Sequence, residues 1–165
     1  MTIDPKIQGS FVGIIGKSCC RQRVGDYRYF SAGFGKQVPN EKASKNVVPF
    51  YGEWEIGSYT STWRIIRDGN VVCSGRDLVD SDDELNKRLQ GITLGTVVAV
   101  EMLSKFEVRV SLDNGILLDF ICLSGDYDEV FHVFAPEHIF IRYSLMNGWE
   151  VRKSNVPNSN DNSTV

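Results

Sequence analysis

The sequence predicts a mostly antiparallel, β-rich α+β domain, built as a strongly curved sheet or half-barrel with one helix packed on it. Short segments rich in β-branched and aromatic residues recur along the chain and are separated by turn signals. A convincing helix pattern occurs at residues 81–90, and strands do not alternate with helices, which argues against a doubly wound parallel fold. The 165 residues, 42% hydrophobic and 24% charged, have the composition of one globular domain.

This domain is predicted to span residues 10–153, with flexible segments at both ends. Residues 1–9 are expected to form a loose lead-in, and residues 154–165 form a polar tail with too few apolar side chains to build a core. No apolar run reaches the roughly 18 residues of a membrane helix. The start of the chain lacks the basic and apolar regions of a signal peptide. We therefore expect a cytoplasmic protein without membrane contacts.

The first part of the chain is predicted to contain two strands and one long loop. Residues 10–17 and 26–34 are rich in the β-branched and aromatic side chains that favour strands. Residues 35–49 are polar and contain two prolines, which predicts a loop. Loops of this length are uncommon in compact domains unless they have a function, so this loop is a secondary candidate site.

Residues 52–75 are predicted to form a hairpin with a two-residue turn at Asp68-Gly69. In the resulting register Ile65 faces Val72. The apolar positions change phase at Gly57-Ser58, where a β-bulge would shift the alternation by one residue. Such a bulge would turn the later aromatic residues back toward the same core.

The helix at residues 81–90 begins with a capping box, in which Ser81 and Glu84 satisfy free backbone amides. Leu85 and Leu89 share one face of this helix and are expected to pack on the sheet. The strands that follow are predicted at residues 96–103, 106–112, 116–123, 129–134, 138–144 and 148–153.

A second hairpin is predicted to turn at Asn114-Gly115, with Val110 opposite Asp119. In this register the Asp119 carboxylate shares an apolar face of its strand. A buried carboxylate requires a cationic or hydrogen-bonding partner. We expect that partner to be Arg64 or Arg142.

No catalytic, cofactor or metal motif in the sequence passes a physical test. Residues 11–18 lack one glycine of a phosphate-binding loop, and no helix is predicted behind them. The four cysteines have no zinc-site spacing and are expected to be free thiols. His132 alternates with apolar residues, so we interpret it as a strand residue with a satisfied ring. Cys19 and Cys20 would be reactive if their basic neighbours lowered a thiol pKa.

The acidic residues are clustered, although the net charge is only −3. This charge argues against a nucleic-acid-binding surface. Residues 80–84 and 126–129 hold seven of the 21 carboxylates. The first cluster also favours the helix dipole, whereas the second, around an aromatic residue, suits a surface that binds a basic protein. The candidate partner-binding residues are Asp80, Asp82, Asp83, Asp126, Tyr127, Asp128 and Glu129.

The order of several segments resembles one protein family. These segments are GFGKQVPNEKASKN (33–46), YGEWEIGSYTSTWRI (51–65), DGNVVCSGRD (68–77), LQGITLGTVVAV (89–100) and VSLDNGILLDFI (110–121). Together they resemble small, β-rich bacterial proteins that are largely uncharacterised or assigned as immunity proteins of polymorphic, contact-dependent toxin systems. The resemblance implies a cytosolic inhibitor that binds one toxin domain, in many cases a nuclease, and blocks its active site.

The working hypothesis is therefore an immunity protein without enzymatic activity and without a cofactor. One alternative is a small-molecule-binding module, with the ligand in the mouth of the curved sheet among Tyr59, Trp63 and Asp119. A second alternative is a hydrolase that depends on Cys19 or Cys20, or a nucleotide hydrolase. Trp63 and its aromatic neighbours are expected to belong mostly to the core; the alternative is that Trp63 or Tyr59 is an exposed contact.

Overall fold

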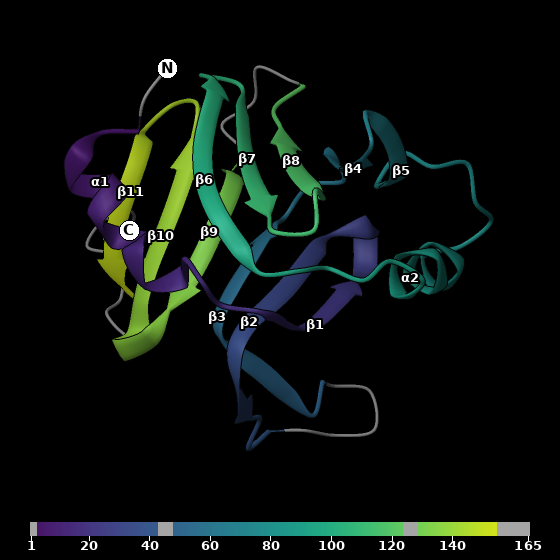
Figure 1. The fold of residues 1–165 in the computed structure, drawn as a ribbon, viewed down its shortest axis with the longest axis horizontal. Helices are drawn as coiled ribbons and strands as arrows, with labels where there is room; N and C mark the ends of the chain where they lie inside the picture. The colour runs from purple at the N-terminus through teal and green to yellow at the C-terminus, as the bar shows by residue number, and fades with distance from the viewer. Residues whose placement is uncertain (1–2, 43–47, 124–128, 155–165) are drawn as a thin grey trace, which may run out of the picture.

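Two antiparallel sheets form the body of the protein (Figure 1). The structure is a computed structural model that describes residues 3–42, 48–123 and 129–154. The six-stranded sheet contains, in spatial order, β1 (Cys19–Val24), β2 (Phe30–Pro39), β3 (Phe50–Ser58), β9 (Glu129–Ala135), β10 (Ile139–Ser144) and β11 (Gly148–Lys153). The five-stranded sheet contains β5 (Asn70–Ser74), β4 (Trp63–Arg67), β8 (Leu117–Ile121), β7 (Glu107–Leu112) and β6 (Val97–Ser104). The predicted fold class is confirmed, with two open sheets in the described part of the chain.

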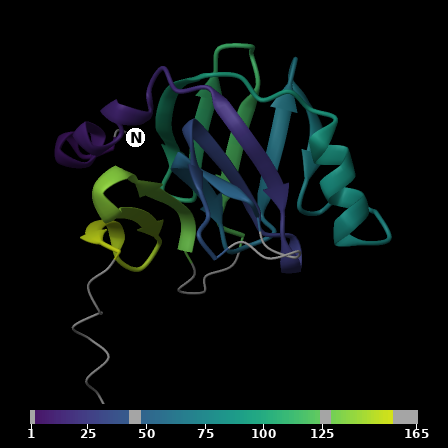
Figure 2. The same cartoon turned by 90° about the horizontal axis from the view of Figure 1, so that it is seen from below.

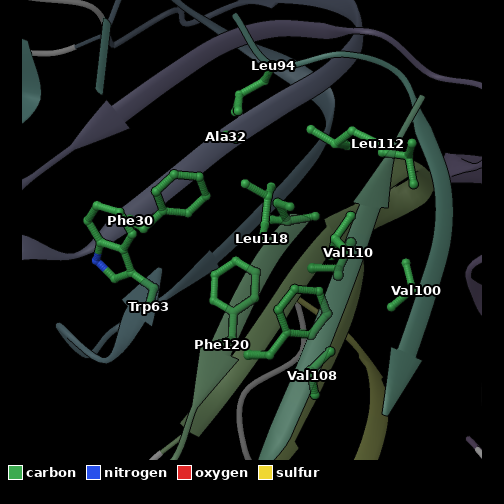
Figure 3. Packing of buried hydrophobic residues seen from close by; sticks show 14 of the residues in the cluster. Phe30, Ala32, Trp63, Leu94, Val100, Val108, Val110, Leu112, Leu118 and Phe120 are labelled. Carbon is green, nitrogen blue, oxygen red and sulfur yellow. The ribbon is translucent and has the colours of Figure 1, made fainter. Parts of the chain in front are cut away.

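The hydrophobic core lies between the two sheets. Figure 3 shows Phe30 of β2, Trp63 of β4 and Phe120 of β8 directed into this space. The ring centroids of Phe30 and Trp63 are 5.0 Å apart, and those of Phe30 and Phe120 are 5.8 Å apart. All three side chains are buried. Burying a large apolar side chain contributes about 1.5–3 kcal/mol, so the packing of one sheet on the other stabilises the fold.

The chain crosses from one sheet to the other at residues 59–62. β3 ends at Ser58 in the six-stranded sheet, and β4 begins at Trp63 in the five-stranded sheet. The predicted β-bulge at Gly57-Ser58 is therefore wrong, because the change of phase marks a change of sheet. Even positions on β3 and odd positions on β4 both face the core, since the two sheets face each other.

The predicted helix is confirmed as α2 (Asp82–Gln90). The Ser81 hydroxyl accepts a hydrogen bond from the Glu84 amide at 3.1 Å, as predicted for an N-cap. Leu85 and Leu89 are buried. The helix lies beside β1, at one end of the six-stranded sheet (Figure 1).

The predicted strand at residues 10–17 is wrong. Helix α1 (Pro5–Ser10) ends at the first of these residues, and a 3-10 turn (Val12–Ile14) follows. Phe11 and Ile14 are buried, while Val12, Gly13 and Ile15 are exposed, which is helical rather than strand spacing. Apolar content alone does not distinguish these two periods in so short a segment.

The lead-in before residue 10 packs on the core through Ile3 and through Ile7 of α1, which is partly buried. The Asp4 carboxylate accepts from the Lys6 amide at 2.8 Å and caps the helix, and Pro5 occupies the first helical position, where no N–H is needed. Ile3 is buried. Figure 2 shows α1 beside β10 and β11, on the side of the molecule opposite α2.

The turn at Asp68-Gly69 is confirmed, with positive φ at both residues. Beyond it the register shifts, and Ile65 pairs with Cys73 instead of Val72. The shift lies between Ile65 and Ile66, where one extra residue on β5 produces a bulge. The residue types at the turn therefore predict where the chain reverses direction, but not which residues pair further along the two strands.

The register predicted around Asn114-Gly115 is wrong by one residue. The structure pairs Asp119 with Arg109 rather than with Val110. Gly115 has a φ of 80°, and the turn contains one residue more than predicted. A shift of one residue moves every side chain of a strand to the other face. Asp119 consequently lies on the outer face of the five-stranded sheet.

The strand predicted at residues 26–34 is correct only from Phe30, because Asp26–Arg28 form a 3-10 turn, and β1 was not predicted. The strand predictions after α2 are confirmed. The six segments predicted after α2 correspond to β6 to β11. The predicted loop at residues 35–49 is shorter than expected because β2 continues to Pro39, and residues 43–47 lie outside the described residues. Among the helices of the described segments, none is long and apolar enough to cross a membrane.

Candidate functional site

The predicted acidic site is described in part. Three of its residues lie outside the described residues, namely Asp126, Tyr127 and Asp128. Asp80 and Asp83 are exposed at the start of α2, and Asp82 forms an ion pair with Arg28 at 3.3 Å. Glu129 is the first residue of β9.

Tyr27 lies between the two described parts of this acidic site. It lines a hollow of about 560 Å³ together with Asp82 and Ser61. It also lines a second hollow, of about 260 Å³, together with Tyr29 and Glu129. The Tyr27 side chain is 79% exposed. An aromatic side chain is therefore displayed between carboxylates from two distant segments.

The turn that carries Tyr27 has an unfavourable backbone conformation. Tyr27 and Arg28, the central residues of the turn between β1 and β2, have φ values of 57° and 61°. The Tyr29 amide donates to the Asp26 carbonyl at 3.3 Å, which closes a type I′ turn. Such turns favour Asn and Gly, and the left-handed conformation costs other residues roughly 1–2 kcal/mol each.

Arg28 holds this strained turn in place. Its guanidinium donates to the carbonyls of Gly75, Asp77 and Val79 at 3.2, 2.8 and 3.2 Å. Its own carbonyl accepts from Trp63 Nε1 at 2.7 Å. Hydrogen bonds that involve an ionised group are stronger than neutral ones. These bonds offset the backbone strain and fix the neighbouring Tyr27 at the surface.

A row of three tyrosines begins at this turn and extends across the surface. It consists of Tyr27, Tyr29 and Tyr59, and we call it the tyrosine row. The ring centroids of successive members are 5.8 Å apart in both pairs. Tyr59 is 51% exposed, and its ring contacts His132 at a centroid distance of 4.4 Å. Partial burial, and to a smaller extent the charge of Glu129, raise the pKa of the Tyr59 hydroxyl. This group therefore stays protonated and keeps its hydrogen-bond donor.

His132 ends the row inside a larger hollow. Its Nδ1 is bonded to Glu129 Oε1, and the residue is 5% exposed. The ring also contacts Phe134 and Phe140 at centroid distances of 5.4 and 6.0 Å. It lines a hollow of about 700 Å³ on the outer face of the six-stranded sheet, which we call the His132 hollow. The interpretation of a satisfied ring is correct for Nδ1, whereas Nε2 has no hydrogen bond within the described residues.

Asp119 belongs to an ion-pair network on the other sheet. Its fully buried carboxylate accepts from Arg109 Nε at 2.6 Å and from Arg64 Nε at 2.9 Å. Burial raises the pKa of Asp119, but hydrogen bonds from Arg109 and Arg64 outweigh it and hold that pKa below its usual value. Of the two partners predicted for Asp119, Arg64 is therefore confirmed. Arg142 is bonded to Glu150 instead.

The three residues of the predicted small-molecule site are not brought together. Trp63 is buried in the core, and Asp119 lies on the outer face of the five-stranded sheet. Tyr59 is exposed beside the six-stranded sheet. These side chains therefore line no common cavity among those found in the described part of the protein.

The adjacent cysteines are not activated thiols. Burial raises the pKa of Cys19 to about 12, and burial also raises the pKa of Cys20. The condition for reactivity, a thiol pKa lowered by basic neighbours, is not met, because desolvation of the thiolate outweighs the charge of Arg21. All four cysteines are free, as predicted.

The segment that partly matches a phosphate-binding loop has a packing role. A Cβ atom on Gly13 would lie 2.5 Å from the Trp54 ring, so the glycine allows close approach of that ring. The Lys17 ammonium forms an ion pair with Glu53 at 2.6 Å. Within the described ranges, no group of three or more potential metal ligands is assembled.

Comparison of the chain with known protein families, curated proteins and solved structures finds no match. The residues that the structure adds to the candidate site are Tyr27, Arg28 and Tyr29. Nothing local in the sequence marks them, because the carbonyls that hold Arg28 come from residues about fifty positions away.

Proposed function

We propose that this protein is an immunity protein, a non-catalytic cytosolic inhibitor that binds a bacterial toxin domain and blocks its active site. The observation that carries the proposal is the exposed Tyr27 side chain on a strained turn that Arg28 ties to distant backbone. Backbone strain of this kind persists only where surrounding structure enforces it, and it concentrates at functional sites. The family resemblance of the sequence supports the same function.

The tyrosine row has the properties of a protein-binding surface. Tyrosine offers a large, rigid contact area with a polar tip, and it is enriched among the residues that dominate interface energies. The hollows beside Tyr27 are open to solvent, and the larger one is lined by the exposed Asp26 and the partly exposed Asp82, which suits a protein surface better than an enclosed small ligand. A rigid scaffold limits the entropy lost on binding.

The charges around the row favour a basic partner. Asp80 and Asp83 are exposed at the start of α2, next to Asp82, which lines the hollow at Tyr27, whereas Glu129 at the other end of the row is largely buried and bonded to His132. Negative side chains steer a positively charged protein toward the surface and accelerate association. The substrate clefts of nucleases are basic because they bind phosphates. A nuclease toxin is therefore the partner class that these charges fit.

Co-expression with the toxin encoded by the neighbouring gene tests the proposal. The protein should restore growth, and the double variant Tyr27→Ala, Tyr59→Ala should lose at least tenfold in affinity, since two interface tyrosines typically contribute more than about 1.4 kcal/mol. Phe106→Ala is the matched control, because Phe106 is an exposed aromatic residue on the other sheet. Failure of the parent protein to protect, or equal protection by the double variant, contradicts the proposal.

Association kinetics test the role of charge separately. Asp83→Lys should slow association with the toxin domain, most strongly at low ionic strength, whereas Glu41→Lys reverses an equally exposed charge away from the row and should change little. Stopped-flow measurements at two salt concentrations give the association rate constant of each variant. The same slowing in both variants would show that net charge, rather than this surface, directs binding.

A further inference from the structure

The His132 hollow lies where two strands of the six-stranded sheet separate. In the described residues, β3 pairs with β9 at Glu55, Ile56 and Gly57, although β3 itself begins at Phe50. The part of β3 that does not pair with β9 forms one wall of the hollow. The turn between β9 and β10 forms the other wall. Its volume of about 700 Å³ is within the range of roughly 300–1,000 Å³ that is typical of ligand sites.

His132 presents a hydrogen-bond acceptor to this hollow. Nδ1 is bonded to the Glu129 carboxylate, and in the tautomer that donates Nδ1–H to it, Nε2 is a hydrogen-bond acceptor. Nε2 lies over Gly57, 2.9 Å from the position that a Cβ atom would occupy there. Because Gly57 has no side chain, this nitrogen can lie close over the neighbouring strand at the edge of the hollow. The hollow therefore offers an acceptor that is oriented by a carboxylate and suited to an N–H donor.

The charges that line the hollow leave a surplus of negative charge. Arg21 is bonded through Nε and Nη2 to the Glu55 carboxylate at 2.9 and 2.8 Å. Glu53, the next carboxylate, is paired with Lys17 at 2.6 Å. Glu137 also lines the hollow and has neither an ion pair nor a hydrogen bond in the described part of the protein. The charges of Glu55 and Glu53 are therefore neutralised by their partners, and the Glu137 carboxylate is the remaining unpaired charge among these described lining residues.

The turn that carries Glu137 is strained in the same way as the turn at Tyr27. Glu137 and His138 have φ values of 62° and 61°. The His138 carbonyl accepts from the Ser154 amide at 2.6 Å, which holds the turn against the end of β11. A second left-handed turn without Gly or Asn therefore lies at the rim of the hollow.

Aromatic rings complete the lining. Tyr59 and Phe134 are both partly exposed there. The guanidinium of Arg21 already lies over the Tyr51 ring at 5.6 Å, which shows that this lining accommodates a stacked cation. The faces of aromatic rings attract cations, and arginine makes such contacts more often than lysine. The adjacent hollow shares Tyr59 and Phe134 but is lined by basic residues, namely Arg142, Arg152 and Lys153.

We infer that the His132 hollow binds an arginine side chain of the protein partner. The guanidinium donates to His132 Nε2, stacks on Tyr59 and lies near the Glu137 carboxylate. This inference rests on the proposed function for the identity of the partner, but the chemistry of the hollow is independent of it. The arginine is an anchor in the hollow, and the tyrosine row forms the larger contact beside it.

Short peptides test the hollow without the toxin. Acetyl-Gly-Arg-Gly-amide is titrated into the full-length protein while the His132 ring signal is followed by NMR. The chain has two histidines, so His138→Gln assigns the signals. The arginine peptide should bind about tenfold more tightly than the citrulline peptide, which has the same shape without the charge. Equal shifts with both peptides, or stronger binding of a Gly-Glu-Gly or Gly-Lys-Gly peptide, overturn the inference.

Two variants that keep the fold identify the contacts. Glu137→Gln removes one exposed charge, and Glu41→Gln is its matched control, because Glu41 is also exposed but does not line the hollow. Glu137→Gln should weaken binding of the arginine peptide about two- to fivefold, while the control leaves it unchanged. Tyr59→Leu should weaken it by a similar factor, because the stacking face is lost. Unchanged affinity in Glu137→Gln and Tyr59→Leu contradicts the assignment.

The two proposals can fail separately. Tyr27→Ala should reduce protection against the toxin and leave binding of the arginine peptide intact, because Tyr27 does not line the His132 hollow. If the protein protects but the peptide does not bind, the inference about the hollow is wrong and the inhibitor function stands. If the peptide binds but no protection is found, the proposed function is wrong.

Discussion

The indole Nε1 of Trp63 donates to the carbonyl of Arg28 at 2.7 Å and connects the two sheets at the strained turn. Arg28 follows Tyr27, and Trp63 is the first residue after the chain has crossed to the five-stranded sheet. The position of the exposed tyrosine therefore depends on packing between the sheets. This single contact relates the core to the proposed binding surface.

Replacing Trp63 should destabilise the protein more than replacing another tryptophan. Trp63→Phe leaves the Arg28 carbonyl without its donor and leaves space in the core, and we expect a loss of about 2–4 kcal/mol in the free energy of unfolding. Trp149→Phe is the control, because Trp149 Nε1 donates to the weak acceptor Met102 Sδ. Urea denaturation measures both. Equal losses would show that the bond to Arg28 contributes little.

The strain at Tyr27 predicts a conflict between stability and function. Tyr27→Asn should raise the free energy of unfolding by about 0.5–1 kcal/mol, because Asn adopts the left-handed conformation more easily. Tyr27→Ala removes the same ring but keeps the strain, so it should bring no gain. Both variants should lose protection against the toxin. Thermal or urea unfolding compares them, and a Tyr27→Asn protein no more stable than Tyr27→Ala contradicts the role of strain.

Features encoded by neighbouring residues could be predicted from the sequence. Ser81 caps α2 because its hydroxyl reaches an amide three residues away, and Asp68-Gly69 turns because both residues tolerate positive φ. The register of Asp119 was predicted wrongly because a turn longer by one residue reverses the face of a whole strand. Local signals determine where the chain turns, while pairing depends on contacts between distant segments.

The candidate site was harder to predict for the same reason. Tyr and Arg are poor residues for a type I′ turn, so no local pattern predicts the turn at Tyr27. It forms because carbonyls near Asp77 bind the Arg28 guanidinium. The sequence predicts His132 as a strand residue with a satisfied ring, which is correct for Nδ1 but, within the described residues, not for Nε2. The position of its Nε2 atom depends on Gly57, far away in the sequence, because a side chain there would clash with this nitrogen.

The Asp119 network should govern part of the acid sensitivity of the fold. The pKa of Asp119 is below its usual value, so its stabilising effect is complete above the ordinary Asp pKa and is lost as the pH falls through the folded-state pKa. Asp119→Asn should cost about 3–5 kcal/mol at neutral pH, since Arg109 and Arg64 are left without their shared partner. It should also flatten the acid limb of the stability profile.

A surface ion pair provides the comparison for Asp119. Glu150→Gln removes the partner of Arg142, where both side chains are partly exposed, and should cost about 0–1 kcal/mol. Chemical denaturation of both variants from pH 3 to pH 8 measures the difference. If Asp119→Asn follows the same acid profile as the parent protein, the carboxylate is not the titrating group.

The partly buried thiol of Cys19 and the buried thiol of Cys73 should resist modification at neutral pH. The pKa of Cys19 is about 12 and that of Cys73 about 11, in both cases because burial disfavours the thiolate, which is the reactive form. Iodoacetamide at pH 7.5, followed by mass spectrometry of peptides, should label both residues at least about a hundredfold more slowly in the native protein than in urea. Cys19→Ser should leave protection against the toxin unchanged. Rapid labelling of Cys19 in the native protein, or loss of function in Cys19→Ser, would instead support thiol chemistry and contradict a non-catalytic inhibitor.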